Sequence, residues 1–194
     1  MSLFSMYLKL GIEHITDLQG YDHILFILTL CGIYLLYQWK KILILITAFT
    51  LGHTTTLVLA TFNIISVNSQ WIEFLIPLTI FITSLANIFH KKTEFSARQH
   101  RLKYALAAFF GLIYGLGFSN YLKNLLGMEK SLFTSLLAFN IGIELGQIVI
   151  VAIILIIAQL VVFGFNVPRR EWNLVISGMG LGISLILMLE RLPV

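Results

Sequence analysis

Six ionisable side chains lie in or beside apolar stretches of this 194-residue chain, where such groups are uncommon. They are three imidazoles and three carboxylates: His14, Asp22, His23, His53, Glu73 and Glu144. An ionisable group at the centre of a membrane-spanning helix costs about 2.5–3.5 kcal/mol, so such residues usually serve a function. Imidazoles with carboxylates suit nickel, cobalt or zinc, whereas calcium and magnesium favour oxygen ligands alone. These residue types therefore predict a site for a divalent transition-metal ion.

Further polar residues fall on the same helical faces as two of these groups. Thr50 precedes His53 by three residues, which places its hydroxyl near the imidazole on a helix. Asn140 and Gln147 lie four residues before and three residues after Glu144, and they give a polar stripe to an otherwise apolar segment. We expect these three residues to support the metal ligands from a second line.

The composition points to a membrane protein. Hydrophobic residues make up 58% of the chain and charged residues 11%, against roughly 45–50% and about 25% in soluble domains. A chain so poor in charge cannot cover a water-soluble fold, which excludes a soluble cytoplasmic enzyme. The net charge of +4 is spread between apolar segments without a basic face, so we expect no nucleic-acid partner. Membrane lipid and the metal ion are the expected partners.

Apolar stretches long enough to cross a bilayer recur along the whole chain. They cover about 22–38, 42–62, 71–89, 102–122, 131–163 and 172–190. The sequence therefore predicts an all-α integral membrane protein: a compact bundle of about six transmembrane helices that forms a single domain over residues 1–194.

Two segments depart from a simple spanning helix. Between Leu3 and Ile15 apolar residues recur at helical spacing with polar residues between them, which predicts a short N-terminal helix lying in the membrane interface. The stretch 131–163 is longer than a bilayer needs. We expect it to tilt, to kink near Gly142 and Gly146, or to extend beyond the membrane, and the sequence leaves the three open.

The distribution of Lys and Arg predicts the orientation. Counted on alternate sides of the spans, nine of these residues fall on one side and four on the other. Under the positive-inside rule both termini then face away from the cytoplasm. A helix rises 1.5 Å per residue. In this orientation His53 lies about 16 Å from the inner end of its span, near mid-membrane, and Glu144 lies about 20 Å from the outer end of its own. We expect all six candidate ligands to meet in the outer half of the bundle.

Five motifs resemble those of the HupE/UreJ family of membrane proteins. They are GIEHI at 11–15, GYDHILF at 20–26, FTLGHTTTL at 49–57, FGLIYGLGF at 110–118 and FNIGIELGQ at 139–147. The resemblance implies a multi-pass protein of the cell's inner membrane that takes up nickel or cobalt. It also implies that the same six residues handle the metal ion, with Asn140 and Gln147 as second-line ligands.

One position departs from the family pattern. The family usually has a histidine before the Gly-Leu-Gly-Phe of the fourth motif, and here that position is Tyr114. The missing imidazole bears on which metal ion is preferred, and Tyr114 joins the expected second-line residues.

Three functions fit these features. The first is a permease for nickel, cobalt or a similar ion, driven by the membrane potential or by a partner protein, because the sequence has no phosphate-binding glycine-rich loop. The second is an intramembrane enzyme in which the same ligands hold zinc and activate water. The third is a metal-free structural subunit of a membrane complex.

Overall fold

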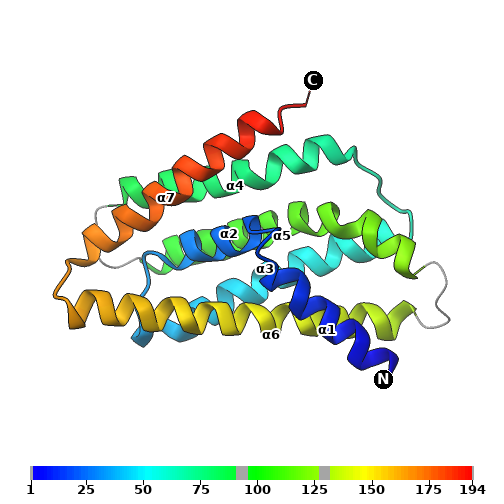
Figure 1. The fold of residues 1–194 in the computed structure, drawn as a ribbon, viewed down its shortest axis with the longest axis horizontal. Coiled ribbons are helices and arrows are strands. Elements are labelled where there is room, and N and C mark those ends of the chain that lie inside the picture. Colours follow the sequence, from blue (N-terminus) through cyan, green and yellow to red (C-terminus); the bar gives the residue numbers. More distant parts are fainter. Residues whose placement is uncertain (1, 91–95, 127–131, 194) are drawn as a thin grey trace.

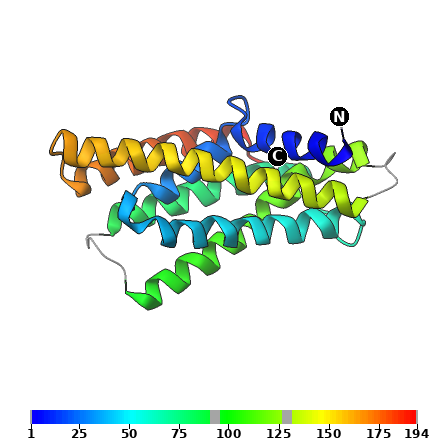
Figure 2. The same cartoon turned by 90° about the horizontal axis from the view of Figure 1, so that it is seen from below.

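A computed structural model describes residues 2–90, 96–126 and 132–193, and over these residues the chain is helical with no strand. Five of the described helices are long and apolar enough to cross a membrane. They are α3 (Trp39–Thr61), α4 (Ser69–Phe89), α5 (Ala97–Leu126), α6 (Leu132–Gln159) and α7 (Arg169–Glu190). The predicted all-α membrane bundle is confirmed, and the long helices run roughly along one axis (Figures 1 and 2).

The first predicted span is shorter than expected. Helix α2 (Asp22–Cys31) has ten residues, about 15 Å at 1.5 Å per residue, and is followed by the 3₁₀ turn η1 (Leu36–Gln38). Helix α1 (Leu3–Thr16) precedes it. It does not lie flat across the end of the bundle, as an interfacial helix would, but lies beside the first half of α6 (Figures 1 and 2). Together α1 and α2 run along the bundle, with a break in the helix between them.

The two ends of the bundle differ in charge. Lysines and arginines open α3, α5 and α7 at the same end, which we call the basic end: Lys40, Lys41, Arg98, Arg101, Arg169 and Arg170. Helix α1 begins at the opposite end, called here the N-terminal end (Figure 1). Lys91, Lys92 and Lys130, which also enter the orientation count, lie outside the described residues.

Glycines let two helix pairs approach closely. A Cβ atom on Gly11 of α1 would overlap the carbonyl of Phe139 on α6, and one on Gly142 would overlap the carbonyl of Leu8. Between α3 and α5, a Cβ on Gly111 would overlap the carbonyl of Phe49. Small residues of this kind allow backbones to touch, which drives helix association in membranes.

The long fifth predicted span forms a helix without a kink at its glycines. Helix α6 continues unbroken through Gly142 and Gly146 and gives way to the π-helical turn η2 (Leu160–Gly164) only near the basic end. The 33 residues of Leu132–Gly164 thus form one long element.

Replacing Gly115 with alanine should destabilise the bundle at the candidate site. The added Cβ would overlap the carbonyl of His53 and the hydroxyl of Thr56, and overpacking of this kind typically costs about 1–3 kcal/mol. The matched control is Gly182→Ala on α7, where a Cβ meets nothing within 4 Å. Thermal unfolding in detergent should show a lower midpoint for Gly115→Ala alone; equal midpoints for both variants would contradict the close α3–α5 contact.

Candidate metal site

Three histidines from three helices converge at the break between α1 and α2. His14 lies near the end of α1, His23 near the start of α2 and His53 within α3. The ring centre of His14 lies 4.7 Å from that of His23 and 6.3 Å from that of His53. Two imidazoles on one tetrahedral ion, with bonds of about 2.0–2.1 Å, have ring centres about 5 Å apart. The first pair already has this separation, and the second needs an approach of about 1 Å.

The histidines present nitrogens suited to a metal ion. The Nε2 atom of each of the three rings is buried and makes no hydrogen bond within the described part of the chain. A buried imidazole nitrogen that lacks a partner is unfavourable unless something binds it. In this structure no three His, Cys, Asp or Glu side chains of the described residues are arranged to enclose an ion. The histidines are therefore candidate ligands that must draw together to bind.

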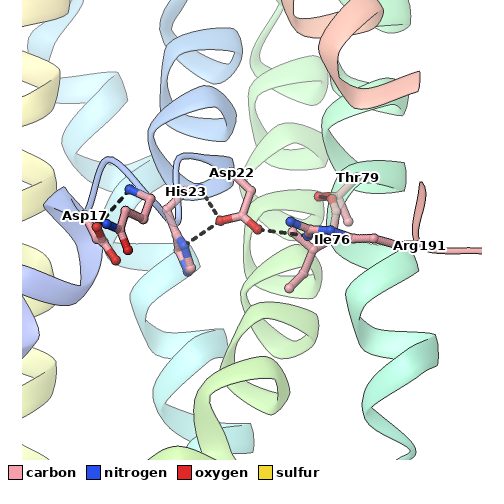
Figure 3. Close-up of polar contacts among 7 residues, drawn as sticks. Asp17, Asp22, His23, Ile76, Thr79 and Arg191 are labelled. Atoms are coloured by element: carbon pink, nitrogen blue, oxygen red, sulfur yellow. Dashed lines mark hydrogen bonds and ion pairs between the residues drawn. The ribbon is translucent and has the colours of Figure 1, made fainter. Parts of the chain in front are cut away.

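Asp22 orients one of these rings. Its Oδ1 accepts a hydrogen bond from the backbone N–H of His23 at 2.9 Å and lies 3.0 Å from the Nδ1 of the same residue (Figure 3). A carboxylate in this position favours the proton on Nδ1, which leaves Nε2 as the lone-pair nitrogen. Asp22 thus suits the role of an outer partner that aims His23 at a metal ion.

Arg191 completes a chain of three polar side chains. Its Nη1 lies 3.2 Å from Oδ2 of Asp22 (Figure 3), so the two oxygens of the carboxylate face two different partners. In the sequence, Arg191 is only one of the four basic residues on the side of the spans that carries fewer of them. It stands more than forty residues after the last recognised motif, and no spacing rule connects it to Asp22; only the packing of α7 across the bundle does so.

Two neighbouring cavities lead to the histidines. One has a volume of about 320 Å³, and its lining includes His14, Asp22, His23, Glu73 and Arg191. The other, of about 760 Å³, shares His14 with the first. Both also border the irregular segment between α1 and α2. Non-helical backbone at membrane depth is tolerated where it lines such a cavity. Glu73, an exposed residue in the first turns of α4, lies at the rim of this space.

Four aromatic rings close the site toward the basic end. Phe26 lies 5.2 Å from Phe49, 5.2 Å from Tyr114 and 6.0 Å from Phe110, between ring centres. All four side chains are buried, and we call them the aromatic plug. Phe49 comes one turn before His53, and Phe110 comes one turn before Tyr114, on helices that start at the basic end. Phe26 comes one turn after His23 on a helix that runs toward the basic end. The three phenylalanine rings therefore lie on the basic side of the histidines, and Tyr114 lies between them and His23.

Tyr114 belongs both to the plug and to the smaller cavity. Its ring centre lies 4.9 Å from that of His23, and its side chain is fully buried. At the position where the related motif usually carries an imidazole, this chain therefore places a large aromatic ring directly against a candidate ligand.

The other expected second-line residues form hydrogen bonds between α3 and α6. The hydroxyl of Thr50 donates to Oε1 of Gln147 at 2.9 Å, and that of Thr54 donates to Oδ1 of Asn140 at 2.6 Å. These bonds are interhelical contacts of the kind that holds membrane helices together. Thr50 therefore supports His53 by fixing α3 against α6 and not by bonding the imidazole.

Glu144 does not join the histidines. Its Oε1 accepts a hydrogen bond of 2.8 Å from Thr47, which precedes His53 by six residues, or about 9 Å along the helix. The carboxylate thus lies nearer the basic end than the candidate ligands do. Of the six predicted residues, the structure brings His14, Asp22, His23 and His53 together, places Glu73 at the rim of the cavity and separates Glu144.

A family model described as "HupE / UreJ protein" matches residues 1–191. Comparisons with curated proteins and with solved structures return no match. The family match covers the whole bundle and includes Arg191, well beyond the motifs that carry the resemblance in the sequence.

Proposed function

Because this chain belongs to the HupE/UreJ family, we propose that it is a permease for a divalent transition-metal ion of the nickel or cobalt type. The resemblance of the motifs to this family implies uptake of nickel or cobalt, and five of the described helices are long enough for a multi-pass membrane protein. The observation that carries the proposal is the group of three histidines with buried Nε2 atoms at a helix break, with a cavity on one side and a closed aromatic plug on the other.

The proposed route begins at the N-terminal end. The basic residues at the opposite end favour a cytoplasmic basic end under the positive-inside rule, so the cavities open outward in the cell's inner membrane. Carboxylates at their mouths, Asp17 and Glu73, raise the local concentration of cations. The ion then exchanges water for the nitrogens of His14, His23 and His53. Beyond the plug, Glu144 offers the next ligand.

Passage requires the plug to open. In this structure the rings of Phe26 and Phe49 pack against each other and against Tyr114, which fits a state that is open outward and closed inward. Transporters commonly bind their cargo at interrupted helices and expose it to each side in turn. The break between α1 and α2 is the natural hinge for such a movement, because it has no helical hydrogen bonds to lose.

The membrane potential supplies sufficient energy for uptake. Moving one charge across 100 mV is worth about 2.3 kcal/mol, so a divalent cation gains about 4.6 kcal/mol. No nucleotide is required for this, in keeping with the lack of a phosphate-binding loop in the sequence.

A second function is favoured by one observation. The tight plug seals the inner half of the bundle, as expected if the histidines hold zinc permanently and activate water for a hydrolytic reaction in the outer cavity. The two proposals differ in how firmly the ion is held. A permeating ion must leave often, whereas a catalytic zinc is retained.

Metal content and exchange test the proposal directly. Protein purified in detergent, stripped with chelator and reloaded with nickel should contain about one ion per chain, and added chelator should remove it within seconds. Zinc that survives prolonged chelation would favour the enzyme. A chain that takes up no nickel, cobalt or zinc would overturn both and favour the structural subunit.

A further inference from the structure

Arg191 places a permanent positive charge inside the cavity that is proposed to receive a cation. The residue caps the end of α7 and lines the 320 Å³ cavity together with His14, His23 and Asp22. Figure 3 shows its side chain reaching across from the end of α7 to the carboxylate at the start of α2. A guanidinium stays protonated at any physiological pH, so it repels every divalent ion that approaches the histidines.

The charge balance of the cavity explains why Arg191 is there. Asp22 is the most enclosed carboxylate in this cavity, with 12% of its side chain exposed, whereas Asp17 and Glu73 are exposed to solvent. An enclosed carboxylate is costly unless a cation or hydrogen-bond donors satisfy it. His23 faces Oδ1, and Arg191 is the cation that faces Oδ2. In the metal-free protein Arg191 therefore supplies the positive charge that balances Asp22.

The properties of the contact between Arg191 and Asp22 fit an ion pair that an incoming metal ion can separate. At 3.2 Å it is longer than the 2.7–2.9 Å usual for a charged N–H···O pair. About a third of the Arg191 side chain is exposed, which gives it an aqueous alternative. Its backbone is at the end of a helix, where a side chain can turn away without disturbing the packing between α4 and α7.

From these contacts we propose that Arg191 and the incoming divalent ion compete for electrostatic attraction to Asp22. When a metal ion reaches Nε2 of His23, the guanidinium withdraws toward solvent; when the ion leaves, Arg191 returns. The residue thus weakens binding and speeds release, as a permease requires of its binding site. This inference rests on the proposed metal site and assigns to it a residue that sets affinity and exchange rate.

Binding of nickel to chelator-stripped protein tests the inference. Arg191→Gln removes the charge and should tighten the dissociation constant for nickel by about tenfold, with slower release to chelator, because a repulsive charge near the ion is lost. Arg191→Lys should stay close to the unsubstituted chain, since the contact is made through one nitrogen and an ammonium can replace it. The matched control is Arg169→Gln at the basic end, where the arginine donates to the hydroxyl of Tyr37; its nickel affinity should not change.

Thermal unfolding with and without nickel separates this role from a purely structural one. Arg191→Gln should lower the unfolding midpoint of the metal-free protein, because Asp22 loses its cation, and nickel should raise that midpoint more than it does in the unsubstituted chain. An unchanged or weaker nickel affinity in Arg191→Gln, while the unsubstituted chain binds nickel, would overturn the inference and leave the permease proposal standing. Failure of the unsubstituted chain to bind any metal ion would instead overturn the proposed function itself.

Discussion

Replacing His53 with alanine should abolish measurable binding of nickel to the purified protein. His53 is the candidate ligand from α3, is 1% exposed, and presents an Nε2 without a hydrogen-bond partner in the described part of the chain. A site built from three imidazoles has no ligand to spare. We therefore expect a larger loss than the roughly 10–100-fold that follows removal of an outer partner of a metal ligand. Isothermal titration with chelator-stripped protein measures it.

Two further variants are compared with His53→Ala: one should lose less nickel affinity, and the other should lose none. Asp22→Asn keeps the shape of the outer partner but not its charge, and should fall within the range of roughly 10–100-fold. His90→Ala removes an imidazole at the other end of α4 and should leave binding unchanged. Because loss of a buried ring can unfold a protein, His53→Gln is measured as a second variant at this position. The unfolding midpoint of each variant is measured as well. Nickel affinity retained in a folded His53→Ala protein would exclude this histidine from the site.

Replacing Glu144 with glutamine should separate binding from transport. The structure bonds this carboxylate to Thr47, which lies about 9 Å along α3 from His53 toward the basic end, and a glutamine oxygen can also accept that hydrogen bond. We expect nickel to bind the histidines with ordinary affinity in Glu144→Gln. Uptake into vesicles should fall at least about tenfold, because the ion loses the only charged ligand proposed beyond the plug and must cross an apolar region at a cost of a few kcal/mol.

The control for this variant is Glu171→Gln. Glu171 is an exposed carboxylate in the first turn of α7 at the basic end, and its loss makes the same change in charge outside the proposed route. If Glu144→Gln instead abolished nickel binding in detergent, Glu144 would belong to the same site as His53, as the sequence predicts. The separation seen in the structure would then not persist in the metal-bound state.

The long helices were predictable because long apolar segments leave the chain few alternatives in a bilayer. That His14, His23 and His53 meet in one half of the bundle was also expected from the sequence, since span order and residue depth place all three there. The early end of α2 was less visible, because 22–38 reads as one apolar stretch although the helix within it ends at Cys31. Apolar content shows that a segment can be buried, but it does not show where the helix within that segment ends.

The contacts that surround the site depend on packing and were not predictable from one chain. Thr50 and Asn140 looked like supports for nearby ligands on their own helices, yet both bond across the α3–α6 interface. The aromatic plug unites rings from α2, α3 and α5, and phenylalanines at helical spacing are ordinary core residues when read in sequence. Arg191 reaches Asp22 from 169 residues away, and only the fold relates the two.

Potential-driven flux of nickel into proteoliposomes tests the central claim most directly. Protein reconstituted with a nickel-sensitive dye inside the vesicles should admit nickel when a negative-inside potential is imposed. The rate should rise with the potential and be lost in His53→Ala. Empty vesicles and vesicles that hold His53→Ala set the background. A folded, reconstituted protein that binds nickel or zinc but passes no nickel, cobalt, zinc or manganese at any potential would contradict the permease and move the zinc enzyme to first place.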